Sequence, residues 1–198
     1  METAILARHG ESELSIGGVL NGDPRVRCAL TERGEEQARA LGRALAQTPL
    51  GLCVTSEFER ARQTAELALA GRDVPRLVLA ELNDVRYGSY EGGAFDDYLR
   101  WAASADPEAE APGRGESRAA IANRYTRAYR TILERPESTI LVVAHGLAVR
   151  YVLDALAGRD PVPVVDQVPY ARPYAVKRAE LEQAVQRLER WAAAPAWA

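Results

Sequence analysis

The stretch Thr139-Ile-Leu-Val-Val-Ala144, followed at once by His145-Gly146, decides the fold. An unbroken run of β-branched and apolar residues predicts a strand that is buried on both faces, as in a parallel sheet. Residues 3–7 form a second such run, which ends at Arg8-His9-Gly10. The carboxyl ends of parallel strands meet at one edge of a sheet and bind ligands there, so we expect both histidines at that edge.

Strand and helix patterns alternate outward from these two runs. This alternation predicts an α/β fold, a three-layer sandwich whose mainly parallel central sheet has helices on both faces. Ser56-Glu57-Phe58-Glu59 has the pattern of a capping box, so we expect Ser56 to cap the helix that follows it. Further strands are predicted at residues 52–55, 76–79 and 174–177, and further helices at residues 31–47 (with Thr31 as N-cap), 117–134, 147–156 and 179–191.

The composition fits a single domain over residues 1–198, because 47% of the residues are hydrophobic and 27% are charged. A net charge of −3 without a basic block argues against a nucleic-acid partner. No apolar run has the length of a membrane span or the pattern of a leader peptide, and Cys28 and Cys53 lack disulfide-framework spacing. We therefore predict a cytoplasmic protein without membrane contact. Its oligomeric state stays open, with a homodimer as one option.

The segment from about residue 86 to 115 interrupts the alternation. It is rich in aromatic residues at its start and has an acidic tail that contains proline and glycine. One interpretation is a small cap over the ligand pocket, made of one short helix and loops. The other is a surface excursion whose aromatic side chains simply pack on the body of the domain.

Both histidines of the chain stand in the same context. Each follows an apolar run and precedes a glycine, which lets a backbone or a phosphate come close. A neutral imidazole is a nucleophile toward phosphorus at pH 7 without an activating base, and it leaves readily once protonated. Two such histidines, His9 and His145, predict a site for phosphoryl chemistry.

A phosphoryl group spreads negative charge over its oxygens, so the site needs fixed cations. Arg8 adjoins His9, and Arg60 and Arg62 lie at the start of the helix predicted after Ser56. The arginine fork can donate two parallel hydrogen bonds to phosphate. Residues two apart point to different faces of a helix, so at most one of Arg60 and Arg62 faces the pocket, and composition leaves the choice open.

A leaving alkoxide needs a proton, so we also expect a carboxylic acid near the phosphate. Glu81, Asp84 and Glu91 all follow the strand predicted at residues 76–79, and each alone is equally explained as loop charge. The two histidines and two cysteines have no metal-ligand spacing, and the chain has no GxxxxGKS/T phosphate loop. We therefore predict that the site uses no metal and no cofactor.

Several motifs resemble those of the histidine phosphatase superfamily, in its phosphoglycerate mutase-like branch. Arg8-His9-Gly10-Glu11-Ser12 is similar to the family signature. Residues 56–65, SEFERARQTA, are similar to the family's SPLxRAxxTA segment. The other matching segments, in the family's order, are LTERG at 30–34, LNDVRYG at 82–88 with YEG at 90–92, and VAHG at 143–146, so the resemblance covers about residues 3–158.

The resemblance implies a role for each matching residue. It implies that His9 is the nucleophile and becomes phosphorylated, and that Asp84 stands at the position of the general acid. It assigns the pocket arginine to Arg60 rather than Arg62. The remaining implied positions are Arg8 and His145 at the phosphoryl group, Asn21 and Gly22 as weaker phosphate contacts, and Ser15, Tyr87 and Gly146 as substrate-facing residues.

Three positions depart from the family pattern. Asp84 stands where the family has glutamate, which shortens the acid by one methylene. Ser15 stands where mutase-like members have asparagine, and Glu57 replaces the proline of the SP pair.

The predicted function is a phosphomonoesterase that acts through a phosphohistidine on a small phosphorylated metabolite. One alternative is phosphoglycerate mutase-type transfer, which would need a longer cap and more cations to hold its intermediate. Asp106, Glu108 and Glu110 make the tail of the cap acidic, which favours the phosphatase. A module that binds a phosphorylated ligand without turnover is the non-enzyme alternative, and the shortened acid is its only support.

Overall fold

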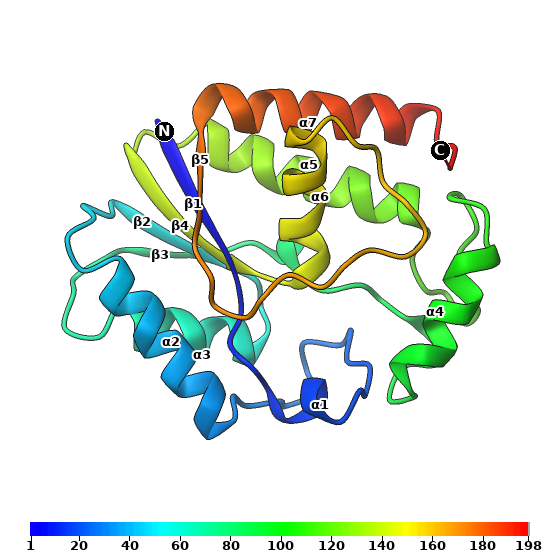
Figure 1. Cartoon of the computed structure of the whole chain (residues 1–198), viewed down its shortest axis with the longest axis horizontal. Coiled ribbons are helices and arrows are strands. Elements are labelled where there is room, and N and C mark those ends of the chain that lie inside the picture. Colours follow the sequence, from blue (N-terminus) through cyan, green and yellow to red (C-terminus); the bar gives the residue numbers. More distant parts are fainter. Residues whose placement is uncertain (198) are drawn as a thin grey trace.

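A five-stranded sheet in the order β3-β2-β4-β1-β5 forms the centre of the computed structural model, which describes residues 1–197 (Figure 1). Strands β1 to β4 are parallel, and β5 pairs antiparallel with β1. The mainly parallel sheet that the sequence predicts is confirmed. The strands span Thr3–Arg8 (β1), Leu52–Thr55 (β2), Arg76–Val78 (β3), Thr139–Ala144 (β4) and Tyr174–Lys177 (β5).

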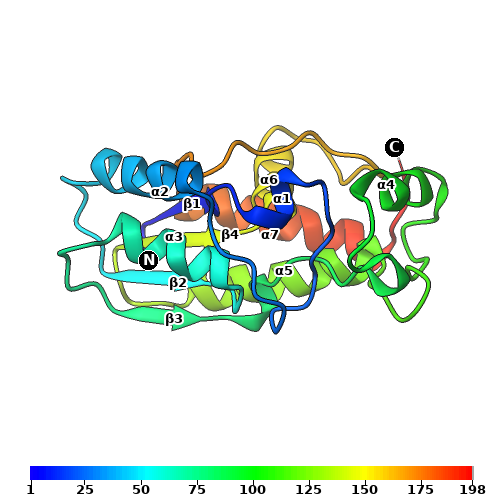
Figure 2. The same ribbon diagram turned by 90° about the horizontal axis from the view of Figure 1, so that it is seen from below.

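Side chains along the two central strands alternate between two apolar layers, because successive residues of a strand point to opposite faces. Leu6 and Val142 belong to one buried cluster, and Ile5 and Leu141 belong to the other. Two groups of helices cover the two faces, as Figures 1 and 2 show. One group consists of α2 (Glu32–Ala44) and α3 (Glu59–Ala68), and the other of α5 (Arg118–Leu133), α6 (Gly146–Leu156) and α7 (Arg178–Ala193).

The helix starts show where local sequence signals hold and where they fail. The Thr31 hydroxyl accepts a hydrogen bond from the backbone of Gly34 at 3.0 Å, so this predicted N-cap is correct. The predicted cap at Ser56 is wrong. Helix α3 begins at Glu59, and Phe58 occupies its N-cap position without a side-chain bond. The Ser56 hydroxyl instead contacts His145, a partner distant in the sequence.

Three segments gather at the carboxyl ends of β1 and β4 (Figure 1). They are the short helix α1 (Glu13–Ile16), helix α4 (Phe95–Ser104), and residues 159–173, which we call the strap because they run from α6 to β5 across this edge. Neither α1 nor the course of the strap is predicted from the sequence. Two 3-10 turns, η1 (Ala80–Leu82) and η2 (Gly88–Tyr90), precede α4. Within residues 1–197, none of the helices combines the length and apolar character that a bilayer span needs.

Candidate active site

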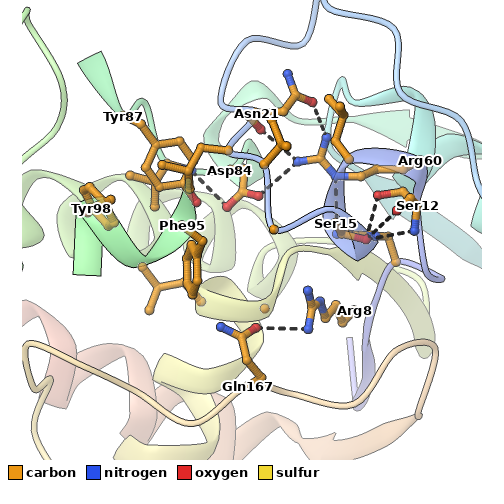
Figure 3. A pocket seen from close by; sticks show the side chains of 18 of the residues that line it. Arg8, Ser12, Ser15, Asn21, Arg60, Asp84, Tyr87, Phe95, Tyr98 and Gln167 are labelled. Carbon is orange, nitrogen blue, oxygen red and sulfur yellow. Dashed lines mark hydrogen bonds and ion pairs between the residues drawn. The ribbon is translucent and has the colours of Figure 1, made fainter. Parts of the chain in front are cut away.

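A cavity of about 390 Å³ opens at the carboxyl edge of the sheet (Figure 3). It lies where β1 and β4 end, which is the place that parallel-sheet geometry predicts for a ligand. Eight of the ten site residues proposed from the sequence line the cavity: Arg8, His9, Ser15, Asn21, Arg60, Asp84, Tyr87 and Gly146. Residues of α4 and the strap line it as well. His145 lies directly beneath these residues, fully buried, and Gly22 lies outside the lining.

Backbone contacts fix the tautomer of His9. Its Nδ1 lies 2.7 Å from the carbonyl oxygen of Gly10. Since a carbonyl can only accept, Nδ1 carries the proton. Nε2 therefore holds the lone pair, and it accepts a hydrogen bond from Nε of Arg60 at 3.3 Å. The unprotonated nitrogen of His9 is thus the one directed toward a cation.

Arg60 is the hub of the site, and it is only 4% exposed. Its Nη1 donates to Oδ1 of Asn21 at 2.6 Å, and its Nη2 donates to Oδ2 of Asp84 at 3.0 Å (Figure 3). Arg62, two residues further along α3, is exposed and does not line the cavity. The structure therefore places Arg60, and not Arg62, on the cavity side.

Asp84 and His145 form a second pair beside Arg60. Nδ1 of His145 lies 3.3 Å from Oδ2 of Asp84, and Nε2 lies 2.8 Å from the hydroxyl oxygen of Ser56. Because a carboxylate accepts, Nδ1 is the protonated nitrogen, and the Ser56 hydroxyl donates to Nε2. The backbone N–H of Phe58 in turn donates to Ser56 at 3.4 Å. The hydroxyl that the sequence assigns to a helix cap thus orients His145.

The buried groups have shifted pKa values. Burial holds the pKa of His9 well below its usual value, and the positive charge of Arg60 acts in the same direction. Burial also lowers the pKa of His145 to about 4, although Asp84 opposes this shift. Burial alone would raise the pKa of Asp84, but contacts with His145 and Arg60 outweigh it and hold that pKa well below its usual range. At pH 7 both imidazoles are therefore neutral, and Asp84 is ionised.

The strap holds Arg8. Its Nη1 donates to Oε1 of Gln167 and to the carbonyl oxygen of Val168, both at 3.0 Å. The ring of Tyr170 stacks on the guanidinium, with 4.0 Å between Cζ and the ring centroid. Sequence reasoning missed both Gln167 and Tyr170, because the strap has no periodic pattern and lies far from Arg8 along the chain.

Gly22 differs from its predicted role. Its backbone N–H already donates to the carboxylate of Glu91 at 2.8 Å. A Cβ at this position would lie 1.9 Å from the carbonyl oxygen of Val85, so only glycine fits. Gly22 is thus outside the cavity lining, and its small size allows two backbone segments to approach closely. Asn21, by contrast, lines the cavity and is held by Arg60.

The acids that compete with Asp84 lie elsewhere. Neither Glu81 nor Glu91 lines the cavity. The two oxygens of Glu91 accept the backbone N–H groups of Gly22 and Tyr87, so this side chain ties the loops together. Of these three acids, only Asp84 lines the cavity. Its carboxylate contacts Arg60 and His145 there. Asp166 of the strap also lines the cavity, and no motif in the sequence indicates this position.

The far wall of the cavity is aromatic. Tyr87, Phe95 and Tyr98 line it, and the rings of Tyr87 and Tyr98 meet edge to face with 4.8 Å between their centroids (Figure 3). Arg118, the first residue of α5, also lines the cavity and is 7% exposed. No motif in the sequence distinguishes Arg118 from other helix arginines, so it could be found only from the structure.

Metal-ligating side chains do not cluster in the part of the chain that the structure describes. Within residues 1–197, no three side chains of the types His, Cys, Asp and Glu lie together in a geometry that could hold a metal ion. The cavity is instead lined by Arg8, Arg60 and His9, and His145 is buried against Arg60. Such a set of donors suits an oxyanion ligand.

A family model described as the histidine phosphatase superfamily (branch 1) matches residues 4–194. The chain belongs to this superfamily, as its motifs predict. A solved structure with the same fold is the alpha-ribazole phosphatase from Shigella flexneri. It is 28% identical, has a TM-score of 0.74, and the comparison covers 87% of this chain and 89% of that chain.

Curated relatives include both phosphatases and mutases. The adenosylcobalamin/alpha-ribazole phosphatase of Salmonella typhimurium is 44% identical over 86 residues, which span 43% of this chain and only 42% of that enzyme. The 2,3-bisphosphoglycerate-dependent phosphoglycerate mutase of Methylobacterium radiotolerans is 34% identical over 181 residues, 82% of each chain. This chain is therefore similar to members of both activities.

Proposed function

We propose that this protein is a phosphomonoesterase that transfers the phosphoryl group of a small phosphorylated metabolite to His9 and then to water. One observation carries the proposal. The carbonyl of Gly10 holds the proton of His9 on Nδ1, which leaves the Nε2 lone pair in the cavity beside Arg60. A neutral, oriented imidazole next to a fixed cation is the arrangement that attack on a phosphoryl group needs.

The charges of the cavity suit a phosphate dianion. Arg8 and Arg60 supply two permanent positive charges, and Asp84 supplies one negative charge in the ligand-free state. We propose that both arginines and His145 hold the phosphoryl oxygens, with Asn21 as a further donor. In this proposal no metal or other cofactor takes part in the reaction.

The proposed reaction has two steps. In the first, Nε2 of His9 attacks phosphorus, the bond from phosphorus to the substrate oxygen breaks, and protonated Asp84 gives its proton to that oxygen. In the second step, Asp84 takes a proton from a water molecule while the oxygen of that water attacks phosphorus. The phosphorus–nitrogen bond then breaks, and the electron pair returns to Nε2. The products are an alcohol and inorganic phosphate.

The acid step requires Asp84 to change its protonation state. It is ionised in the ligand-free protein because Arg60 and His145 favour the carboxylate. An incoming phosphate dianion competes for Arg60 and adds negative charge close to Asp84. Both effects raise the pKa of the carboxylate, so substrate binding favours uptake of the proton that the leaving group needs.

The aromatic wall supports the interpretation of residues 86–115 as a cap on a single domain. Tyr87, Phe95 and Tyr98 all come from this segment and all line the cavity. We propose that they contact the part of the substrate beyond the phosphoryl group, with Ser15 and Gly146 at the opposite wall. We also propose a cytoplasmic location, which the two free, buried cysteines Cys28 and Cys53 support.

The test is to trap the phosphoenzyme. Wild type is mixed with a phosphorus-labelled phosphomonoester and quenched within milliseconds at alkaline pH, because phosphohistidine is labile in acid. Label is expected on His9, and none is expected in His9→Ala, whose fold is checked by circular dichroism. Turnover is expected to persist in a metal chelator. Label on a serine or on His145 would contradict the assignment.

A mutase assay primed with a bisphosphoglycerate completes this test. Release of inorganic phosphate with little isomerisation of a phosphoglycerate is expected. If isomerisation is faster than phosphate release, the protein is a mutase and not a hydrolase. His9 would still be the phosphorylated residue in that case. Binding of phosphorylated compounds without any turnover would support a non-enzymatic binding module instead.

A further inference from the structure

The wall of the cavity beside Tyr98 contains a buried cation, Arg118, that has no acid partner among residues 1–197. Arg118 is 7% exposed, and within residues 1–197 its side chain has one hydrogen-bond acceptor, the carbonyl oxygen of Pro163 in the strap, 2.8 Å from Nη2. Its Nε is buried and has no acceptor in the same part of the chain. A buried guanidinium with unused donors costs stability, so its retention here needs an explanation.

Two phenols flank this guanidinium. The ring centroid of Tyr98 is 5.8 Å from Cζ of Arg118, and the hydroxyl of Tyr151 in α6 interacts with the same guanidinium. The hydroxyl of Tyr98 is buried and finds no partner among residues 1–197. Buried hydroxyls and guanidinium N–H groups are hydrogen-bonded in most proteins, so two unused donors at one place, Nε of Arg118 and the hydroxyl of Tyr98, indicate a site for an acceptor.

The position of this cluster relates it to the leaving group. In Figure 3, Tyr98 lies on one side of Asp84, and Arg8 and Arg60 lie on the other. The proposed acid, Asp84, must contact the oxygen that joins the phosphoryl group to the rest of the substrate. The rest of the substrate therefore extends from Asp84 toward Tyr98 and Arg118, which line the same cavity.

We propose that Arg118 and the hydroxyl of Tyr98, backed by Tyr151, form a second oxyanion subsite that binds a carboxylate or a second phosphate on the substrate's leaving group. This inference rests on the proposed phosphatase function and names its substrate class: phosphomonoesters that carry a second anionic group. Tyr87 and Phe95, which line the same cavity, would contact the carbon skeleton that joins the phosphoryl group to the second anion.

Matched substrate pairs test the subsite. The first pair is 3-phosphoglycerate and glycerol 3-phosphate, and the second is 4-carboxyphenyl phosphate and phenyl phosphate. Only one member of each pair carries a carboxylate. In wild type, kcat/KM is expected to favour the carboxylate member of at least one pair by about 10- to 100-fold, the range typical of charge-assisted hydrogen bonds. Equal kcat/KM within both pairs would overturn the proposal.

Variants assign the preference to these side chains. Arg118→Gln keeps a donor for the Pro163 carbonyl and removes the charge, so the ratio of kcat/KM within the favoured pair should fall about 10-fold or more. Arg118→Lys should keep part of the ratio. If Arg118 only holds the strap in place, Arg118→Gln lowers kcat/KM equally for both substrates of the pair. The ratio would then be unchanged, which would overturn the proposal. Tyr98→Phe removes a single oxygen and should lower the ratio by about 3-fold even if Arg118→Gln fails to fold.

A separate measurement distinguishes this proposal from the proposed function. Hydrolysis of p-nitrophenyl phosphate that His9→Ala abolishes reports on the phosphatase alone. If that hydrolysis is absent, titration calorimetry with 3-phosphoglycerate and glycerol 3-phosphate still measures the subsite in wild type and Tyr98→Phe. A binding ratio that does not depend on the carboxylate or on Tyr98 would overturn the subsite whatever the outcome for catalysis.

Discussion

Nη2 of Arg60 lies 3.0 Å from Oδ2 of Asp84. The cation proposed to hold the phosphoryl group is thus paired, in the ligand-free protein, with the acid proposed to protonate the leaving group. A phosphate dianion that binds Arg60 would release Asp84 from this pair, so the proposed mechanism couples phosphate binding to protonation of Asp84 through one guanidinium. The same contact also makes Arg60 the side chain whose loss affects both steps.

The first prediction concerns the two arginines of α3. Arg60→Gln should lower kcat/KM by an amount equivalent to about 2–4 kcal/mol of transition-state stabilisation, because it removes a charge-assisted contact in a buried site. Arg62→Gln is the matched control, since Arg62 is exposed on another face of the same helix. Steady-state kinetics with p-nitrophenyl phosphate measures both. Equal losses in the two variants would mean that the cavity side of α3 is wrongly assigned.

The second prediction concerns Asp84. p-Nitrophenolate is stable as an anion and hardly needs a proton in the transition state, whereas an alkoxide does. Asp84→Asn should therefore lower kcat/KM for glycerol 3-phosphate by about 10²- to 10⁴-fold, and for p-nitrophenyl phosphate by far less. Removal of the acid should also change the alkaline limb of the pH–rate profile for the alkyl substrate.

Glu81→Gln is the control for this experiment. Its side chain is outside the cavity lining, so the ratio of the two rates should stay near that of wild type. A leaving-group dependence in Glu81→Gln, together with its absence in Asp84→Asn, would move the acid to Glu81.

A third prediction concerns the support of the acid loop. Arg124 donates from Nη1 to the carbonyl oxygens of Glu81 and Asn83, at 2.9 and 2.7 Å, and from Nη2 to that of Asp84 at 3.1 Å. It also forms an ion pair with Glu116, which is 4% exposed. One guanidinium thus binds three backbone carbonyl oxygens within residues 81–84, next to the proposed acid, so we expect Arg124 to act as a positioning residue.

Arg124→Met should lower the free energy of unfolding by about 3–5 kcal/mol, because the buried Glu116 loses its buried guanidinium partner and keeps only its contacts with Arg86. The double variant Arg124→Met/Glu116→Gln should recover part of that loss, as measured by urea denaturation. Positioning also predicts that the double variant keeps a defect that is larger for an alkyl phosphate than for p-nitrophenyl phosphate. A uniform defect on both substrates would limit Arg124 to a structural role.

The sequence predicts this fold well where the signal is local. Residues 52–55 and 139–144 are predicted as strands with the bounds that the structure gives, because continuous apolar runs in a sheet buried on both faces are unambiguous. Ser56 shows the limit of such reasoning. Its capping pattern is present, but its hydroxyl is used by His145, which is 89 positions away. A long-range contact replaces the local one.

The site follows the same rule. His9 and His145 could be placed from sequence, because each directly ends a buried strand. Gln167 and Tyr170 could not, since the strap that carries them has no periodicity and its course depends on contacts with Arg8. Arg118 could not be distinguished from other helix arginines until the structure brought it beside Tyr98.

The last prediction concerns stability against acid. The pKa of His145 is lowered by burial to about 4, whereas an exposed histidine in the unfolded chain has an ordinary value near 6.5. The pKa of His9 is lowered in the same direction. A group with a depressed pKa in the folded state binds its proton more readily when unfolded. Its contribution to stability is therefore present above pH 6.5 and is lost as the pH falls toward the folded value.

The free energy of unfolding should accordingly fall between pH 7 and pH 5, by about 2 kcal/mol for His145 alone, with a further loss from His9. Urea denaturation at pH 7, 6 and 5 measures this change. The carboxylate of Asp84 does not contribute in this window, because its pKa is well below the usual range and its unfolded value is also below 5.

Variants locate the effect. The chain has two histidines, so the double variant His9→Asn/His145→Gln should be less stable than wild type at pH 7 but should have a much flatter pH dependence down to pH 5. His9→Asn alone and His145→Gln alone should each remove part of the pH dependence of the free energy of unfolding. A double variant that keeps the full slope of wild type would show that the two imidazoles are not the groups that take up protons on unfolding, and that neither is held neutral by burial in the folded protein.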